Sequence, residues 1–223
     1  MQRGARRTGK RTGARATPFP VLMVILILVA PGVLTACSST APRPAALTAT
    51  RQIHVSPVSA AGNPVSGFRT TQTVADASCE AGSEAIGRAY RCFADNSLYD
   101  PCWAARAAAP TVLCLPFPWS TTDIRLEVGA PLSVIPAEPG TNEPWGVELA
   151  SGQRCELLQG AHSLFAGRVV DYYCNAQLSL LRGLNRTAPV WRAASVTGAV
   201  GNQVFGPSEQ IRIAWFGSPD SFY

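Results

Sequence analysis

The chain has 223 residues, with nineteen basic and fourteen acidic side chains and a formal charge of +5. Six of the basic residues lie before Cys37 and all the acids lie after it, so residues 37–223 carry thirteen arginines against fourteen acids, a net charge of −1. A chain without excess positive charge lacks the electrostatic footprint of nucleic-acid-binding proteins, and we exclude that class.

The first residues predict an export signal. Residues 1–17 contain six basic side chains and no acid, and the apolar run 21–30 follows them and ends at Pro31-Gly32. This run is shorter than the ~20 residues that a membrane-spanning helix needs. A basic start followed by a short apolar run is typical of a secretory signal peptide.

The tetrad Leu34-Thr35-Ala36-Cys37 follows this run. It resembles the processing site of bacterial lipoproteins, in which a small residue precedes the cysteine that becomes the mature first residue. The resemblance implies removal of residues 1–36 and a diacylglyceryl group on Cys37, with acyl chains such as palmitate. Two or three acyl chains hold a protein stably at a bilayer, here on the extracytoplasmic face of the cell membrane. An uncleaved transmembrane anchor and a plain secretory signal are the alternatives.

Residues 37–75 are expected to form the lipidated cysteine and a flexible tether. They are rich in Ser, Thr, Ala, Pro and Gly and have few large apolar side chains. Such a segment buries too little surface to offset the entropy lost on ordering. Within it, residues 52–56 alternate in polarity and offer one edge strand. We therefore expect a folded domain over 76–217 and a short tail over 218–223.

Six cysteines remain once Cys37 is set aside: Cys79, Cys92, Cys102, Cys114, Cys155 and Cys174. An even number in an exported chain indicates a disulfide framework. Fifteen pairings are open to six cysteines. We expect each to pair with its neighbour, as Cys79–Cys92, Cys102–Cys114 and Cys155–Cys174, and each bond to contribute about 3 kcal/mol. A metal site needs closer spacing, such as C-x-x-C, so we expect neither a metal nor another cofactor.

The folded domain is predicted to be mainly β. Short β-rich or alternating runs lie at 111–115, 123–128, 145–150, 154–157, 168–174, 189–196 and 210–216. Runs of this kind, separated by polar turns, favour an antiparallel sheet, curled or sandwich-like. Helix signals are confined to one short helix within 76–90 and one over 102–108, which Asp100-Pro101 would begin.

The sequence contains no catalytic motif. A triad of His162, Ser163 and Asp171 can be written, but adjacent residues on an extended chain point in opposite directions. We interpret His162 as an ordinary loop or surface histidine. The only lysine is Lys10, which excludes the serine–lysine sites of penicillin-binding proteins and β-lactamases. Paired cysteines would leave no thiol nucleophile.

Carboxylates and aromatic rings are the remaining candidates for chemistry. Among the acids of the domain we single out five, two of which could serve as acid and base on a sugar bond: Asp95, Asp100, Asp123, Glu148 and Asp171. Acids are equally common in turns and on solvated strand faces. Trp191 and Trp215 fall in apolar strand runs and are expected in the core. The proline-rich segment 115–119 is the expected interaction loop, with Phe117 and Trp119 as candidate binding residues.

Several cysteine-containing segments resemble a group of secreted or lipid-anchored actinobacterial proteins. The resemblance lies in Tyr90-Arg91-Cys92, Asp100-Pro101-Cys102, Cys114 with Pro118-Trp119, Gly152-Gln153-Arg154-Cys155, Tyr172-Tyr173-Cys174 and Trp191. It covers most of residues 79–216 and implies the disulfide framework but no activity.

We expect a lipid-anchored cell-envelope protein whose β domain binds an envelope protein, a glycan or a small molecule without catalysis. The alternative is an envelope hydrolase that uses a carboxylate pair on cell-wall glycan. A scaffold that assists another envelope protein is a third interpretation.

Overall fold

The computed structural model describes residues 48–59, 61–105, 110–132 and 143–218. The signal segment, Cys37 and the last five residues lie outside these ranges. All the elements of the described residues are strands, so the expected mainly β, antiparallel fold is confirmed. Nowhere in these ranges is there a helix long and apolar enough to cross a membrane.

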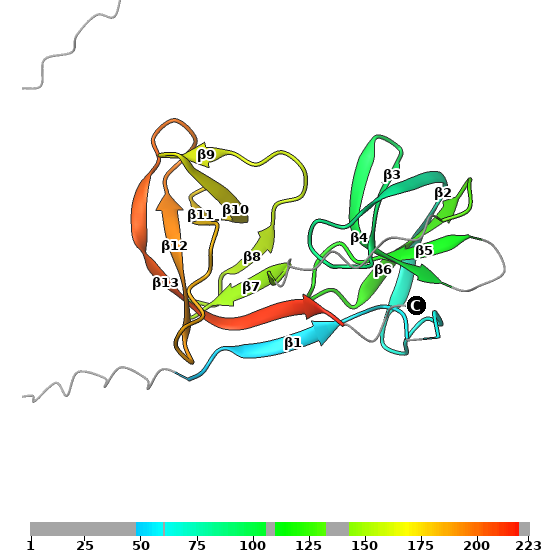
Figure 1. Cartoon of the computed structure of the whole chain (residues 1–223), viewed down its shortest axis with the longest axis horizontal. Coiled ribbons are helices and arrows are strands. Elements are labelled where there is room, and N and C mark those ends of the chain that lie inside the picture. Colours follow the sequence, from blue (N-terminus) through cyan, green and yellow to red (C-terminus); the bar gives the residue numbers. More distant parts are fainter. Residues whose placement is uncertain (1–47, 60, 106–109, 133–142, 219–223) are drawn as a thin grey trace, which may run out of the picture. The chain divides into compact units, whose positions relative to one another are not determined.

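The first group of strands closes into a five-stranded barrel (Figure 1). It consists of β2 (Arg69–Gly82), β3 (Tyr90–Ala94), β4 (Ser97–Ala105), β5 (Thr111–Cys114) and β6 (Thr122–Val128). Successive strands pair in antiparallel fashion, and β6 returns to pair with β2 in parallel. An odd number of strands in a meander leaves the first and last strands pointing the same way, which makes the closing pair parallel. We call this group the first barrel.

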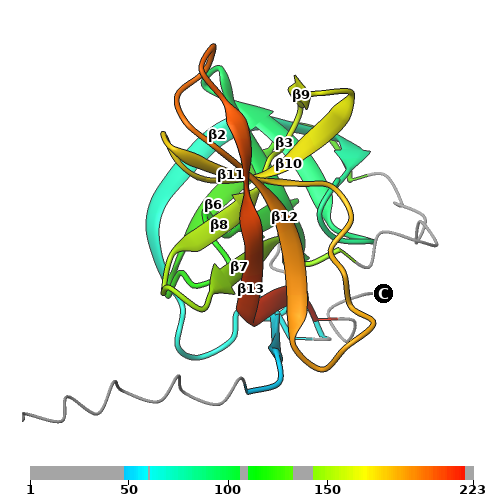
Figure 2. The same ribbon diagram turned by 90° about the vertical axis from the view of Figure 1, so that its left-hand side faces the viewer.

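The second group is an antiparallel sheet that also closes on itself. It consists of β7 (Gly146–Leu149), β8 (Arg154–Leu157), β10 (Arg168–Asn175), β11 (Leu178–Leu181), β12 (Trp191–Thr197) and β13 (Val204–Gly217), with β9 (Leu164–Phe165) beside β10. The long strand β13 pairs with both β12 and β7, and Figure 2 shows it running alongside β12. Six strands of this group close the barrel, and because six is an even number, the closing pair of β7 and β13 is antiparallel. We call this group the second barrel.

Strand β1 (Arg51–Val55) corrects the expected tether, because it pairs in parallel with residues 213–217 of β13. Just before it, the Thr50 hydroxyl donates to the Ile211 carbonyl at 2.6 Å and accepts from the Trp191 N–H at 2.8 Å. Strand β2 also begins at Arg69 rather than after residue 75. A tether reaching residue 75 is therefore wrong. The alternation over residues 52–56 did indicate the edge strand that β1 forms. The composition of the segment nevertheless hid its order, which comes from main-chain pairing and from a few apolar side chains such as Val58, which is 2 % exposed.

The two expected short helices are also wrong for the residues that the structure describes. Residues 76–82 belong to β2 and residues 102–105 to β4, while 106–108 lie outside the described ranges. Alanines favour a helix when isolated, but Ala104 pairs with Val112 across β4 and β5. Tertiary pairing thus overrides the local helix preference of this segment.

The three disulfides join the expected neighbours, and all three predicted pairings are confirmed. Cys79–Cys92 and Cys102–Cys114 lie among the apolar side chains that fill the first barrel. Cys155 is fully buried in the interior of the second barrel, where its bond to Cys174 links β8 to β10. Each barrel thus has its own apolar interior and at least one covalent cross-link.

A third apolar cluster lies between the barrels. Trp103 and Leu113 alternate with the inward-facing cysteines of β4 and β5 and therefore point away from the interior of the first barrel. They pack in one cluster with Trp145 and Trp215 of the second barrel. The Trp103 and Trp145 rings meet edge to face, with centroids 5.5 Å apart. This shared cluster holds the barrels together and positions the site described below.

Candidate functional site

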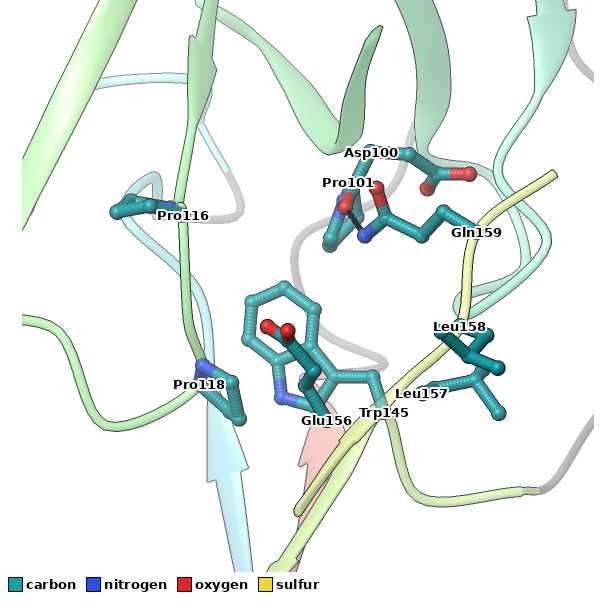
Figure 3. A pocket seen from close by; sticks show the side chains of 9 residues that line it. All are labelled: Asp100, Pro101, Pro116, Pro118, Trp145, Glu156, Leu157, Leu158 and Gln159. Carbon is teal, nitrogen blue, oxygen red and sulfur yellow. Dashed lines mark hydrogen bonds between the residues drawn. The ribbon is translucent and has the colours of Figure 1, made fainter. Parts of the chain in front are cut away.

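A pocket of about 150 Å³ lies where the two barrels meet (Figure 3). We call it the junction pocket, and its lining residues are Asp100, Pro101, Pro116, Pro118, Trp145, Glu156, Leu157, Leu158 and Gln159. The first four come from β4 and the segment after β5 of the first barrel, and the other five come from the second barrel. A cavity of roughly this volume admits a benzene ring, so the pocket can hold one small ring or a short side chain.

The segment 115–119, which the sequence marked as an interaction loop, forms one wall of this pocket. It packs directly on β7 because Gly146 has no side chain: a Cβ there would lie 2.5 Å from Pro118 Cγ and 3.0 Å from Trp119 Cζ3. Pro116 and Pro118 line the pocket as a result. A binding role for Phe117 and Trp119 remains a prediction, but the structure places both beside the pocket wall.

The aromatic rings of this segment form a stack. Phe117, whose side chain is 42 % exposed, lies parallel to Trp119 with ring centroids 5.6 Å apart. Trp119 in turn meets Trp215 edge to face at 5.4 Å. The Arg154 guanidinium lies 5.3 Å from the Trp119 centroid and donates through Nε to Glu148 at 3.1 Å. Trp119 is therefore held on several sides, and Phe117 offers the more open ring.

Glu156 supplies the one carboxylate of the pocket that has no partner among the described residues. It is half-buried on β8, and burial raises the pKa of its carboxyl. Arg154 lies two residues away on the same strand, but its guanidinium is engaged by Glu148 and the aromatic stack. The sequence reasoning missed Glu156. The available signal was strand alternation, because buried Cys155 requires its neighbours on β8 to face away from the barrel interior.

Asp100 lines the same pocket, but its carboxylate is fully engaged elsewhere. It accepts from the Ser83 hydroxyl, from the Glu84 N–H at 3.0 Å and from Arg91 Nε at 3.1 Å. Burial raises the pKa of Asp100, and these three donors act in the opposite direction. In Figure 3 the Asp100 carboxylate points away from Trp145.

Gln159 donates through Nε2 to the main-chain carbonyl of Asp100, which leaves its Oε1 as an acceptor (Figure 3). Trp145 is only 4 % exposed, and its Nε1 is buried without a hydrogen-bond partner in the described part of the chain. The side-chain polar atoms that remain available to a ligand are thus the oxygens of Glu156 and Gln159.

Ion pairs connect the two barrels next to the pocket. Arg91 bridges Asp100 and Glu84 within the first barrel. Glu84 then accepts the Gly160 N–H of the second barrel at 3.1 Å. Burial alone would raise the pKa of Glu84, but Arg91, the Gly160 N–H and His162 together lower it.

His162 occupies the expected loop between β8 and β9, but it is not an ordinary surface histidine. Its Nε2 lies 3.7 Å from Glu84 and its Nδ1 lies 3.3 Å from Asp171, so it sits between carboxylates of the two barrels. Asp171 also pairs with Arg182 at 2.9 Å. Ser163 makes no side-chain hydrogen bond to His162 in the described chain, so the triad written from the sequence is not assembled. This interaction across the barrels was not visible in the local sequence.

The five acids considered as a catalytic pair are dispersed in the fold. Asp123 accepts the Thr70 hydroxyl at 2.6 Å, and Glu148 binds two arginines. Asp95 is exposed in the turn between β3 and β4. Asp100 and Asp171 are engaged as described above. Each buried member of the set thus has a partner, and none offers a free carboxylate to the junction pocket.

No cluster of three or more His, Cys, Asp or Glu side chains that could hold a metal ion occurs in residues 48–59, 61–105, 110–132 and 143–218. Comparison with protein-family models, curated proteins and solved structures finds no match to the chain. What the protein does must therefore be inferred from its own sequence and geometry.

Replacing Glu156 by glutamine should make the protein more stable at neutral pH. Burial raises the pKa of Glu156 in the folded state above its value in the unfolded chain. The protonated carboxyl therefore stabilises the folded state at low pH, and this stabilisation is lost as the pH rises through the folded-state pKa. Glutamine stays neutral and avoids that loss. Thermal unfolding should show a higher Tm for the variant at pH 7, and the difference should vanish below pH ~4.

The matched control is Glu127→Gln, since Glu127 is exposed on β6. It should leave the Tm at pH 7 within experimental error of the unsubstituted protein. An equal or lower Tm for Glu156→Gln at pH 7 would show that the Glu156 carboxylate is not a desolvated, unpaired charge.

Proposed function

We propose that the chain is a lipid-anchored cell-envelope protein whose β domain binds an envelope ligand in the junction pocket without transforming it. The observation that carries this proposal is a pocket with tryptophan, leucine and proline walls and one unpaired carboxylate, Glu156. Ligand sites are typically concave and combine apolar side chains with a few polar groups that orient the ligand. Phe117, exposed next to the wall, would extend the contact beyond the pocket.

The envelope location is supported by two features of the chain. Leu34-Thr35-Ala36-Cys37 resembles a lipoprotein processing site, which implies an acylated Cys37 and an anchor on the extracytoplasmic face. The three disulfides are consistent with that location, because such bonds form and persist in oxidising compartments.

The hydrolase alternative has less support from the geometry of the pocket. Glycoside hydrolysis generally needs two carboxyl groups that flank the scissile bond. The junction pocket offers the carboxylate of Glu156, whereas that of Asp100 is enclosed by Ser83, Glu84 and Arg91. A binding role without bond cleavage accounts for one free carboxylate better than a catalytic pair does.

The binding proposal is tested with solubilised cell-wall fragments and the full-length protein in detergent. Tryptophan fluorescence should change saturably on titration, because Trp145 lines the pocket and Trp119 lies beside its wall. Phe117→Ala should weaken the response, while Phe93→Ala, which alters an exposed phenylalanine on β3, should not. The absence of any saturable change would contradict the proposal, and release of soluble sugar products would favour the hydrolase.

Cys37→Ala should release the protein from the membrane. Alanine has no thiol to accept the diacylglyceryl group, so neither the two nor the three acyl chains of a stable anchor can be attached. Fractionation followed by immunoblotting should find the variant outside the membrane pellet. Ala36→Gly keeps a small residue before the cysteine and should stay membrane-bound. Full membrane retention of the Cys37 variant would count against a lipid anchor.

A further inference from the structure

We infer that the junction pocket takes a primary alkylammonium group, with the ammonium on Glu156 and the alkyl stem against the wall that Pro116 and Pro118 form. This rests on the proposed function and names the chemical class of the ligand. The first support is hydrogen-bond polarity. The accessible free side-chain polar atoms of the pocket, the Glu156 carboxylate and Gln159 Oε1, are acceptors, whereas the unpartnered Trp145 Nε1 is buried. A ligand that satisfies them must donate, and an ammonium group has three donors.

Charge is the second support. Moving a carboxylate out of water is unfavourable unless an opposite charge compensates it. The neighbouring arginines do not compensate Glu156: Arg91 is held by Asp100 and Glu84, and Arg154 is held by Glu148. A neutral donor such as a sugar hydroxyl would supply a hydrogen bond but no charge. A cationic ligand supplies both.

The apolar side chains among the lining residues are the third support. Trp145 presents an indole to the pocket, and tryptophan is the side chain whose face attracts cations most strongly. Pro116 and Pro118 on one side of the pocket give an unbranched alkyl stem an apolar surface beside this indole. The volume of about 150 Å³ is suited to a short alkylammonium end rather than to a whole oligosaccharide.

The test uses n-butylammonium chloride as the probe and n-butanol as its uncharged match, at equal ionic strength, with the full-length protein in detergent. Butylammonium should bind saturably, as followed by tryptophan fluorescence and equilibrium dialysis, and butanol should bind at least tenfold more weakly. Glu156→Gln should reduce the affinity for butylammonium by about tenfold or more, whereas Glu127→Gln should leave it unchanged. Since Glu156→Gln is expected to be more stable than the unsubstituted protein, unfolding cannot explain such a loss.

Two amines separate the sources of the ammonium group. Nα-acetyl-lysine amide carries it on a peptide, and glucosamine carries it on a sugar ring. Preference for either one supports the inference and identifies the source.

Equal binding of butylammonium and butanol, or unchanged affinity for butylammonium in Glu156→Gln, would overturn the inference. If wall fragments bind but butylammonium neither binds nor competes, the ligand class is wrong and the binding function stands. If butylammonium binds and wall fragments do not, the ligand class stands and the envelope ligand is wrong.

Discussion

Replacing Asp100 by alanine should lower the free energy of unfolding by about 3–5 kcal/mol, the range typical for breaking a buried ion pair by removing one partner. Asp100 is 4 % exposed, and its carboxylate accepts from the Ser83 hydroxyl, the Glu84 N–H and Arg91 Nε. Alanine would leave all three donors without this acceptor in a region with little access to water. Urea denaturation followed by far-UV circular dichroism measures the change.

Asp100→Asn is the informative companion variant. Burial raises the pKa of Asp100, which means that its surroundings favour the neutral form of the side chain. A neutral substitute should therefore be tolerated better here than in a solvent-exposed ion pair. Asparagine also keeps one oxygen as an acceptor. It should therefore cost less than the alanine variant. A loss below about 1 kcal/mol for Asp100→Ala, or equal losses for the two variants, would show that this carboxylate does not organise the segment around Ser83.

Most strands of the second barrel could be predicted because their signals are local, although β9 and β11 were missed. The segment 146–157 alternates around the turn Ser151-Gly152, and β10 and β13 contain dense β-branched and aromatic residues. Neighbouring cysteines paired as expected, since each pair lies on adjacent strands. By contrast, Asp100-Pro101 and the alanines after Trp103 gave β4 a local helix signal, and the end of β2 carries Asp76 and Gly82, which are uncommon in strands. Their conformation depends on partners that the local sequence does not reveal.

The site was less predictable than the fold because it depends on how two barrels meet. The aromatic and proline content of 115–119 drew attention to a segment whose Pro116 and Pro118 line the pocket, while its binding role stays a prediction. Glu156 gave no comparable signal, and His162 was named only with Ser163 and Asp171, in a triad that is not assembled. Glu156 matters because its carboxylate has no partner among the described residues. His162 matters because it contacts Glu84 and Asp171, which lie on different barrels. Such pairings are set by tertiary packing rather than by spacing along the chain.

Replacing Trp103 by alanine should cost about 3–5 kcal/mol of unfolding free energy, the range for truncating a buried aromatic side chain. Trp103 is 1 % exposed and lies in the apolar cluster between the barrels, edge to face with Trp145. Its loss removes apolar contacts from both barrels at once and leaves a cavity that strands on either side cannot easily fill. Chemical denaturation should also show whether the barrels still unfold in a single transition.

Trp103→Phe separates the packing of the ring from its polar atom. The Trp103 Nε1 has no hydrogen-bond partner within the described residues, so phenylalanine removes a buried, unsatisfied donor while keeping an aromatic ring against Trp145. We therefore expect less than half the loss of the alanine variant. Equal losses for the two variants would mean that the indole N–H contributes a contact of its own. A loss below about 1 kcal/mol for Trp103→Ala would mean that the cluster between the barrels contributes little to their association.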